Sequence, residues 1–261
     1  MWLRVSALVM RYLYLYRRSL ARAGEVFFWP VMDLVLWGFL TAYMERFAAP
    51  RAVVFLIGAM IFWDVLYRSQ QAITLSLAEE IWVRNILNIF LAPLRTVEIA
   101  IATCLMGVIK AALTLVVLGT LAHVFFAFDI LALGPALVPF VVSLLLFGWA
   151  VGMCTMGLVI RFGQSAEALI WGVPFLLQPF SAVFYPVSVL PGWLQKVAAL
   201  LPSTYVFEGM RNTLATGRPD VARLAASFAM DAVYLVLAGA FLTWMLHLAR
   251  VRGYLTRLGM E

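Results

Sequence analysis

The sequence predicts an all-α polytopic membrane protein that forms a single transmembrane domain over residues 1–261. Composition is the first observation behind this fold class, because 65% of the residues are hydrophobic and only 12% are charged. The second is that six apolar runs are each long enough to cross a hydrocarbon core of about 30 Å. The predicted spans cover residues 27–45, 52–73, 97–124, 133–160, 166–184 and 222–248.

Basic residues predict the orientation of these spans. Twelve arginines flank the termini and the connections after the second and fourth spans, against six basic residues in the remaining connections. Positive charge marks the cytoplasmic side, so we expect a bacterial cytoplasmic (inner) membrane protein with both termini in the cytoplasm. The net charge of +6 comes from these orientation signals, and no nucleic-acid partner is expected.

Residues 1–24 are expected to form an amphipathic helix that lies in the inner membrane interface, in contact with lipid. Apolar and aromatic residues occupy one side of this helix. Four arginines share another face because they recur at spacings of seven, seven and four residues: Arg4, Arg11, Arg18 and Arg22. The alternative is an arginine cluster that only sets orientation.

The connection between the second and third spans, residues 79–92, is too polar to cross the membrane and too apolar for an idle loop. It is predicted to be a helix, because its acidic residues suit a first turn and Pro93 stops it. Its apolar surface includes Trp82, and its polar residues are Glu79, Glu80, Arg84, Asn85 and Asn88. Such a helix either rests on lipid or docks into a groove of a partner.

An enzymatic function finds little support. Glu79, Glu80 and Arg84 spell EExxxR, which resembles the first motif of the CAAX-protease family of intramembrane proteases. The histidine motifs of that family are missing, because the only histidines are His123 and His247. No GxSxG motif appears, and the two cysteines lack metal-ligand spacing. We predict no catalytic residue and no metal site, with a protease-like enzyme as the less favoured alternative.

Prolines interrupt the apolar segment that begins at residue 174. Pro174 and Pro179 can kink the fifth span where neighbouring helices satisfy the freed carbonyls. Pro191 suits the first turn of a short helix, and Pro202 ends that helix. Two short helices of this kind can dip into the outer leaflet and return.

The second of these short helices carries the polar residues of the segment. Ser203 or Thr204 can cap it. Glu208 and Arg211 share one of its faces at a spacing of three residues. Irregular backbone at membrane depth requires protein or water around it, so residues 185–212 are expected to line a pathway or a dimer contact. The alternative is a surface hairpin.

Taken together, these features resemble the integral-membrane subunit of type-2 ABC exporters. The resemblance rests on the N-terminal amphipathic helix, the six spans, EEIWVRNILNIFLAPL and, above all, FYPVSVLPGWLQKVAALLPSTYVFEGMR. It covers nearly the whole chain. It implies a half-transporter, in which two copies of the chain, expected to form a homodimer, build an export pathway driven by two cytoplasmic ABC ATPase subunits.

The resemblance also implies roles for individual residues. Residues 79–92 match the coupling helix of the family, with ATPase contacts at Glu79, Glu80, Trp82, Arg84 and Asn88. Residues 185–212 match re-entrant helices that help close the external end of the pathway. The gate residues expected there are Phe184, Tyr185, Tyr205, Phe207, Glu208 and Arg211.

Nucleotide binding is expected on a separate chain. A Walker A loop needs a lysine after a glycine-rich turn, and both lysines of this chain stand in other contexts, VIKAA and WLQKVA. We therefore expect no cofactor on this chain, with ATP and Mg²⁺ bound by the partner ATPase.

Asp33, Asp64 and Lys110 lie inside predicted spans, where an unpaired charge costs several kcal/mol. We expect a structural pair between Lys110 and either Asp64 or Asp33, with Arg68 as a competing partner of Asp64 one turn away. The alternative is a direct role in the pathway.

The substrate is narrowed only by the aromatic residues of the later spans and the broken segment. Aromatic rings stack on sugars and bind lipophilic cations, and they also anchor helices at membrane interfaces. We expect an amphiphilic or lipid-linked substrate, polysaccharides included. A drug or small lipophilic molecule is the alternative.

Overall fold

The computed structural model describes residues 1–45, 50–83, 85–92 and 94–252. All regular structure in these ranges is helical, which confirms the all-α fold class. The longer helices are α1 (Trp2–Arg18), α2 (Leu20–Glu45), α3 (Pro50–Trp82), α5 (Thr96–Phe126), α6 (Leu137–Phe162), α7 (Ala168–Phe180), α9 (Pro202–Thr216) and α10 (Val221–Val251). The short helices are α4 (Ile86–Leu91), α8 (Gly192–Ala198), η1 (Ile130–Ala136), η2 (Gly163–Ala166) and η3 (Val187–Val189).

Within the described ranges, four helical segments are long and apolar enough to cross a membrane: Val26–Met44, Thr96–Phe126, Ile130–Phe162 and Val221–Ala249. They support a multi-pass membrane protein. The predicted second and fifth spans fall on α3 and α7, which are not among the four. Charged residues such as Asp64 and Arg68 interrupt α3, and α7 has only 13 residues. The count of six spans stays a prediction.

Helix α6 lies at the centre of the bundle, packed against α3 and α10, and α5 also packs on α3. Two glycines one turn apart let α6 approach α3 closely. A Cβ atom on Gly148 would lie 2.8 Å from the Leu66 carbonyl oxygen, and one on Gly152 would lie 2.9 Å from the Gln70 carbonyl oxygen. Small residues at this spacing bring membrane helices together, so α3 and α6 form a tightly packed pair.

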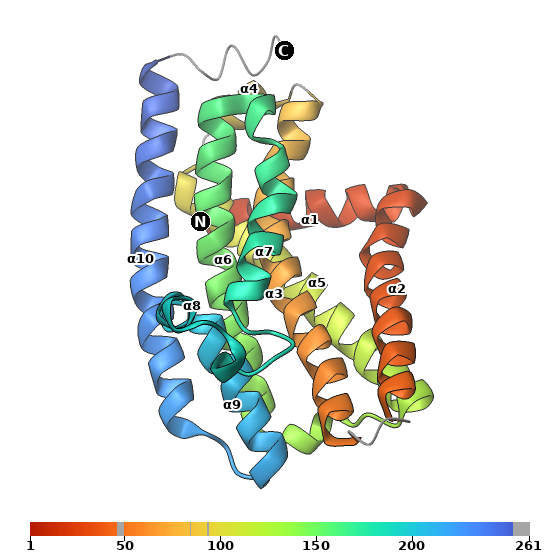
Figure 1. Cartoon of the computed structure of the whole chain (residues 1–261). Coiled ribbons are helices and arrows are strands. Elements are labelled where there is room, and N and C mark those ends of the chain that lie inside the picture. The colour runs from red at the N-terminus through yellow and green to blue at the C-terminus, as the bar shows by residue number, and fades with distance from the viewer. Residues whose placement is uncertain (46–49, 84, 93, 253–261) are drawn as a thin grey trace.

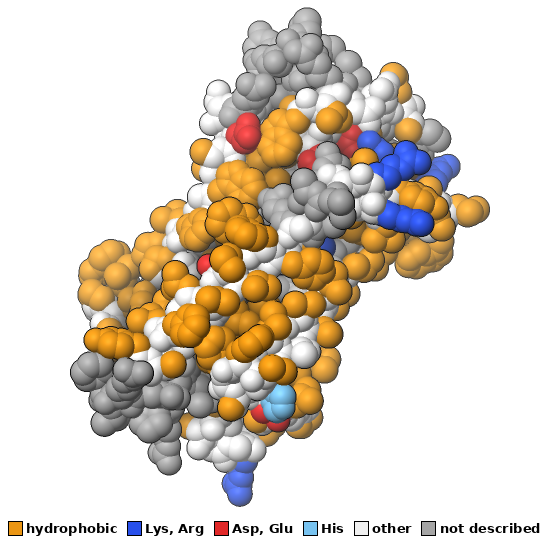
Figure 2. All heavy atoms as spheres, turned by 90° about the vertical axis from the view of Figure 1, so that its right-hand side faces the viewer, with side chains coloured by type: hydrophobic (Ala, Val, Ile, Leu, Met, Phe, Trp, Pro, Cys, Tyr) orange, Lys and Arg blue, Asp and Glu red, His pale blue; other side chains and the backbone are white. Residues whose placement is uncertain are grey.

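Helix α1 lies across the long axis of the bundle (Figure 1). It ends at Arg18, because Ser19 adopts an extended backbone (φ −126°, ψ 104°) and α2 begins at Leu20. The amphipathic helix predicted over residues 1–24 is therefore shorter than expected, and Arg22 belongs to α2. Figure 2 shows apolar side chains over the middle of one face, with most of the visible basic side chains gathered near the level of α1.

Candidate functional site

The connection between α3 and α5 holds the residues that were expected to meet a partner. The single helix predicted over residues 79–92 is wrong: α3 runs to Trp82, and α4 begins separately at Ile86. Asn85 makes the break, since its backbone N–H donates to the Glu80 carbonyl (2.8 Å) and its side-chain amide donates to the Glu80 carboxylate (2.7 Å). Asparagine competes with regular helical hydrogen bonds in this way.

The Glu80 carboxylate is the centre of a polar cluster that joins α1 to this connection. Its residue is only 2% exposed. Arg11 of α1 donates to Oε2 (2.8 Å), and the same guanidinium nitrogen lies 2.6 Å from Oε1. Hydrogen bonds to ionised groups are about twice as strong as neutral ones. Glu80 therefore holds α1 in place against the end of α3.

An apolar seam continues this attachment along α1. The seam joins α1, α4 and α5 through Val5, Leu8, Tyr12, Ile89, Ile99, Ala102 and Met106. Burial raises the pKa of Tyr12 to about 12, and the negative charge of Glu80 acts in the same direction, so the phenol stays neutral. At the start of the seam, the Arg4 guanidinium lies 3.5 Å from Glu98. Helix α1 is thus fixed across the connection and the first turns of α5.

The outer surface of the connection is apolar. Trp82 is 43% exposed, Val83 is 61% exposed and Leu91 is 82% exposed. Asn88 is also exposed, and its side-chain amide donates to Asn85 Oδ1 (2.8 Å). Exposed large apolar side chains that lie close in sequence are typical of contact surfaces. Glu79 is half-buried. Arg84, also predicted to contact the ATPase, lies outside the described residues.

Toward the opposite end of the bundle (Figure 1), Arg211 of α9 ties the broken segment together. Its guanidinium donates to Glu208 (2.6 Å) and to the carbonyls of Ala182 and Val183, and it lies 4.2 Å from the ring centre of Phe55 in α3. Burial lowers the pKa of Arg211 to about 10, and the Glu208 carboxylate opposes that shift, so Arg211 is charged at neutral pH.

Glu208 extends this clamp to the next turn of the chain. Its carboxylate accepts the backbone N–H of Val187 (2.8 Å). The predicted cap of α9 is wrong, because Pro202 occupies its first turn and Ser203 instead shares a hydrogen bond with Ser181 (2.8 Å). Residues 181–187 are therefore held by side chains of α9 at three separate points.

The aromatic residues predicted at the gate are also tied to the protein. Phe184 stacks on Trp37 of α2 with ring centres 4.2 Å apart. The Tyr185 hydroxyl donates to the Pro179 carbonyl (2.7 Å), and the Tyr205 hydroxyl donates to the Ala199 carbonyl (3.0 Å). Phe207 is fully buried in the core, so its side chain does not line an open surface in this conformation.

Residues 43–248, more than three quarters of the 261-residue chain, match the family model described as ABC-2 family transporter protein. The chain belongs to the ABC-2 transporter family. Comparison with curated proteins finds no match. The match includes the connection between α3 and α5 and the whole broken segment. Membership makes the chain a membrane transport subunit, an ABC permease, and confirms the family resemblance of its sequence.

The intramembrane pair predicted for this ABC permease between Lys110 and an aspartate is wrong, because Asp64 lies beside the competing partner, Arg68. Asp64 is 7% exposed and lies 3.4 Å from the Arg68 guanidinium, one turn along α3. The Lys110 ammonium lies 4.6 Å from the ring centre of Tyr16. Asp33 is exposed on α2. Residues one turn apart on a helix meet without any change elsewhere, which favours Arg68 over a partner on another helix.

Sequence reasoning missed Asp231, a buried acid of the permease on α10. It is fully buried, and Ser143 of α6 donates to its Oδ2 atom (2.6 Å). Its Oδ1 atom has no hydrogen-bond partner within the described ranges. An aspartate inside the apolar run 222–248 was the signal that could have found it, since acids inside spans are rare and functional.

Proposed function

We propose that this ABC permease is the membrane subunit of an ATP-driven exporter. In the proposed assembly, two copies of the chain form the pathway, and two cytoplasmic ABC ATPase subunits bind ATP and Mg²⁺ and energise it. The proposed location is the bacterial inner membrane, with both termini in the cytoplasm.

The exposed apolar surface of Trp82, Val83 and Leu91 carries this proposal. A helix-in-groove contact needs large apolar anchors on a rigid support. The support here is the Glu80 carboxylate, which binds both Arg11 of α1 and Asn85 of the connection. A force applied to this surface by an ATPase reaches α1 and α3 through the same cluster.

The broken segment supports an external gate in the proposed exporter. Its turn is held by the Glu208–Arg211 clamp, which contains hydrogen bonds and an ion pair that can be exchanged for others when α9 moves. Interfaces of this kind have discrete alternative arrangements. Phe184, Tyr185 and Tyr205 accompany the clamp.

The proposed substrate is amphiphilic or lipid-linked. Large apolar side chains of the broken segment are exposed, among them Val189 (66%), Trp193 (67%) and Leu200 (62%). Surfaces of this kind suit apolar parts of a substrate or of lipid. The substrate is identified by the compound that cells retain when the gene is deleted. A small lipophilic drug in that role would replace the lipid-linked proposal.

The coupling role is tested with Trp82→Ala, with Trp193→Ala as a matched control because both tryptophans are exposed, at 43% and 67%. Each full-length variant is purified from the native host, and the amount of ABC ATPase that co-purifies with it is measured. We expect Trp82→Ala to reduce the bound ATPase and Trp193→Ala to leave it unchanged. Equal ATPase binding by both variants would contradict the assignment of this surface.

A further inference from the structure

A lateral cavity opens between α5 and α10, with α6 as its floor. Thr96, Ile101 and Cys104 line it from α5, Trp149 from α6, and Gly239 and Thr243 from α10. Its volume is about 360 Å³, at the lower end of the range of roughly 300–1,000 Å³ for small-ligand pockets. All three helices that form it include candidate membrane spans.

The height of the cavity in the bundle follows from α5. Val97, Ala100, Ile101, Cys104 and Leu105 face the cavity, and their spacing of three and four residues puts them on one side of the helix. The other side of the same turns packs against α1 through Ile99, Ala102 and Met106. The cavity therefore lies at the level of α1, the helix proposed to rest in the membrane interface.

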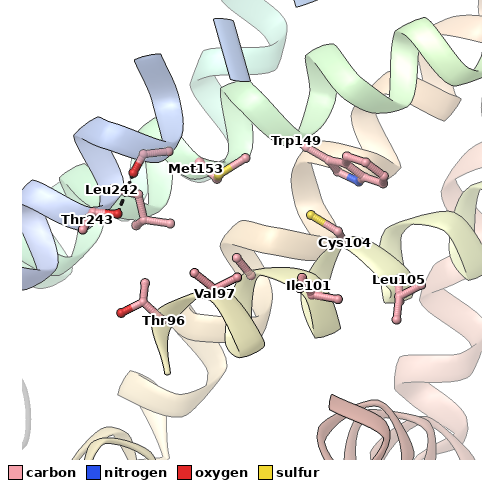
Figure 3. Close-up of a pocket in the computed structure, with 11 residues that line it drawn as sticks. Thr96, Val97, Ile101, Cys104, Leu105, Trp149, Met153, Leu242 and Thr243 are labelled. Carbon is pink, nitrogen blue, oxygen red and sulfur yellow. Dashed lines mark hydrogen bonds between the residues drawn. The ribbon is translucent and has the colours of Figure 1, made fainter. Parts of the chain in front are cut away.

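The lining is almost wholly apolar, and its two threonines lie at one end. Figure 3 shows Thr96 and Thr243 together at one end, with Trp149 and Leu105 at the other. The rest of the lining is aliphatic side chains and sulfur-containing side chains such as Met153. This apolar lining matches a hydrocarbon chain that runs from the threonines toward Trp149.

We propose that the cavity binds an acyl chain of a membrane phospholipid, taken from the leaflet in which α1 lies. The choice of leaflet depends on the interfacial position expected for α1. An empty apolar void loses dispersion contacts on every wall, and acyl chains are the molecules that surround a span at this depth. The end of the cavity at Thr96, the first residue of α5, then lies closest to the headgroups.

Gly239 provides a way to fill the cavity without strain. A Cβ atom built on Gly239 meets no heavy atom within 4 Å, and the same holds for Gly172 on α7, which is outside the cavity. Gly239→Leu is expected to occupy the space of the chain, and Gly172→Leu is its matched control. Both replacements favour helix formation. Ala100→Leu fills the cavity from the opposite wall and serves as a second variant.

The test uses the full-length protein in bilayer discs that contain phosphatidylethanolamine with a diazirine on its acyl chain. After illumination, mass spectrometry maps the labelled residues. We expect labelling concentrated on Ile101, Cys104 and Leu242 in the wild type and in Gly172→Leu. Each displaced methylene lowers affinity about fourfold, so Gly239→Leu and Ala100→Leu should reduce this labelling by about tenfold or more.

Two results would overturn the proposal. One is labelling of the cavity residues that is no stronger than that of exposed positions such as Val116 and Val124, or that is unchanged in both filling variants. The other is rapid disulfide formation between Cys104 residues of two copies in a Cys154→Ala background, because it would show that a second copy fills the cavity.

Discussion

The contact between Arg11 and Glu80 should be the polar interaction that holds α1 to the rest of the permease. Arg11→Met keeps the length of the side chain and removes the donor, and Glu80→Gln keeps the volume and removes the charge. Two contacts from Arg11 reach the carboxylate, at 2.6 and 2.8 Å. A hydrogen bond to a charged group contributes about 1.5–3 kcal/mol.

The exposed fractions of the Arg11 and Glu80 side chains set the expected loss of stability. The Glu80 side chain is 3% exposed and the Arg11 side chain is 36% exposed, so solvent weakens the pair and the lower end of the range applies. Among the described residues, Arg11→Met leaves the buried carboxylate with Asn85 as its donor, and it should lower the free energy of unfolding by about 2 kcal/mol. The double variant should lose about 1.5 kcal/mol less than the sum of the single losses.

The assay is reversible unfolding in mixed micelles with increasing dodecyl sulfate, followed by circular dichroism. Arg17→Met is the control, because Arg17 is an exposed arginine near the end of the same helix, and it should change stability by less than about 0.5 kcal/mol. A coupling energy below about 0.5 kcal/mol between Arg11→Met and Glu80→Gln would mean that the effects of the two variants simply add. That result would refute the assigned role of Glu80.

Three further predictions use the same unfolding assay. Gly148→Ala should cost about 1–3 kcal/mol because its Cβ would meet the Leu66 carbonyl, while Gly172→Ala should be neutral or stabilising; equal effects would contradict the close helix contact. Arg211→Lys should lower the free energy of unfolding by about 2 kcal/mol, since lysine keeps the charge but not the forked donors of arginine. The same variant should be cleaved faster by proteases near residue 185, and an unchanged rate of cleavage would argue against the Glu208–Arg211 clamp. Burial raises the pKa of Asp220, but hydrogen bonds from the Arg223 amide, Asn212 and the Arg223 guanidinium lower that pKa overall. The stabilisation that Asp220 contributes is therefore present above about pH 4 and is lost as the pH falls further. Asp220→Asn should remove this acid-dependent loss of stability, and parallel profiles of stability against pH for the two proteins would contradict the prediction.

Patterns of composition and period identified the helical class and the family, because they depend on the average behaviour of many residues. The break at Asn85 could not be predicted from such patterns for a physical reason. The Glu80 carboxylate that Asn85 binds is held by Arg11, which lies 69 residues before Glu80 in the sequence. The pairing of Ser203 with Ser181 has the same origin. Local propensity assigned both residues to helices or caps, and tertiary hydrogen bonds decided otherwise.

The partners of the intramembrane acids could also be predicted only where they lie close in sequence. Asp64 could be assigned to Arg68 from spacing alone, since both lie on one face of one helix. The hydrogen bond of Asp231 with Ser143 depends on how α6 and α10 pack, and no periodicity in the sequence reports that packing. The presence of Asp231 in a span was visible, whereas its partner was not.

Helix α3 connects the two ends of the proposed mechanism. Near its first turns, Phe55 lies under the Arg211 guanidinium at 4.2 Å, and near its end Glu80 binds Arg11 at 2.6 Å. The helix is continuous between them from Pro50 to Trp82, and 25 residues at about 1.5 Å each separate these contacts by roughly 38 Å. Because α6 packs tightly along α3, a push on the connection cannot be absorbed by bending within α3 and must appear as a shift of the whole helix. We therefore expect movement at the Trp82 surface to reach the Glu208–Arg211 clamp through Phe55, without a chain of separate loop rearrangements.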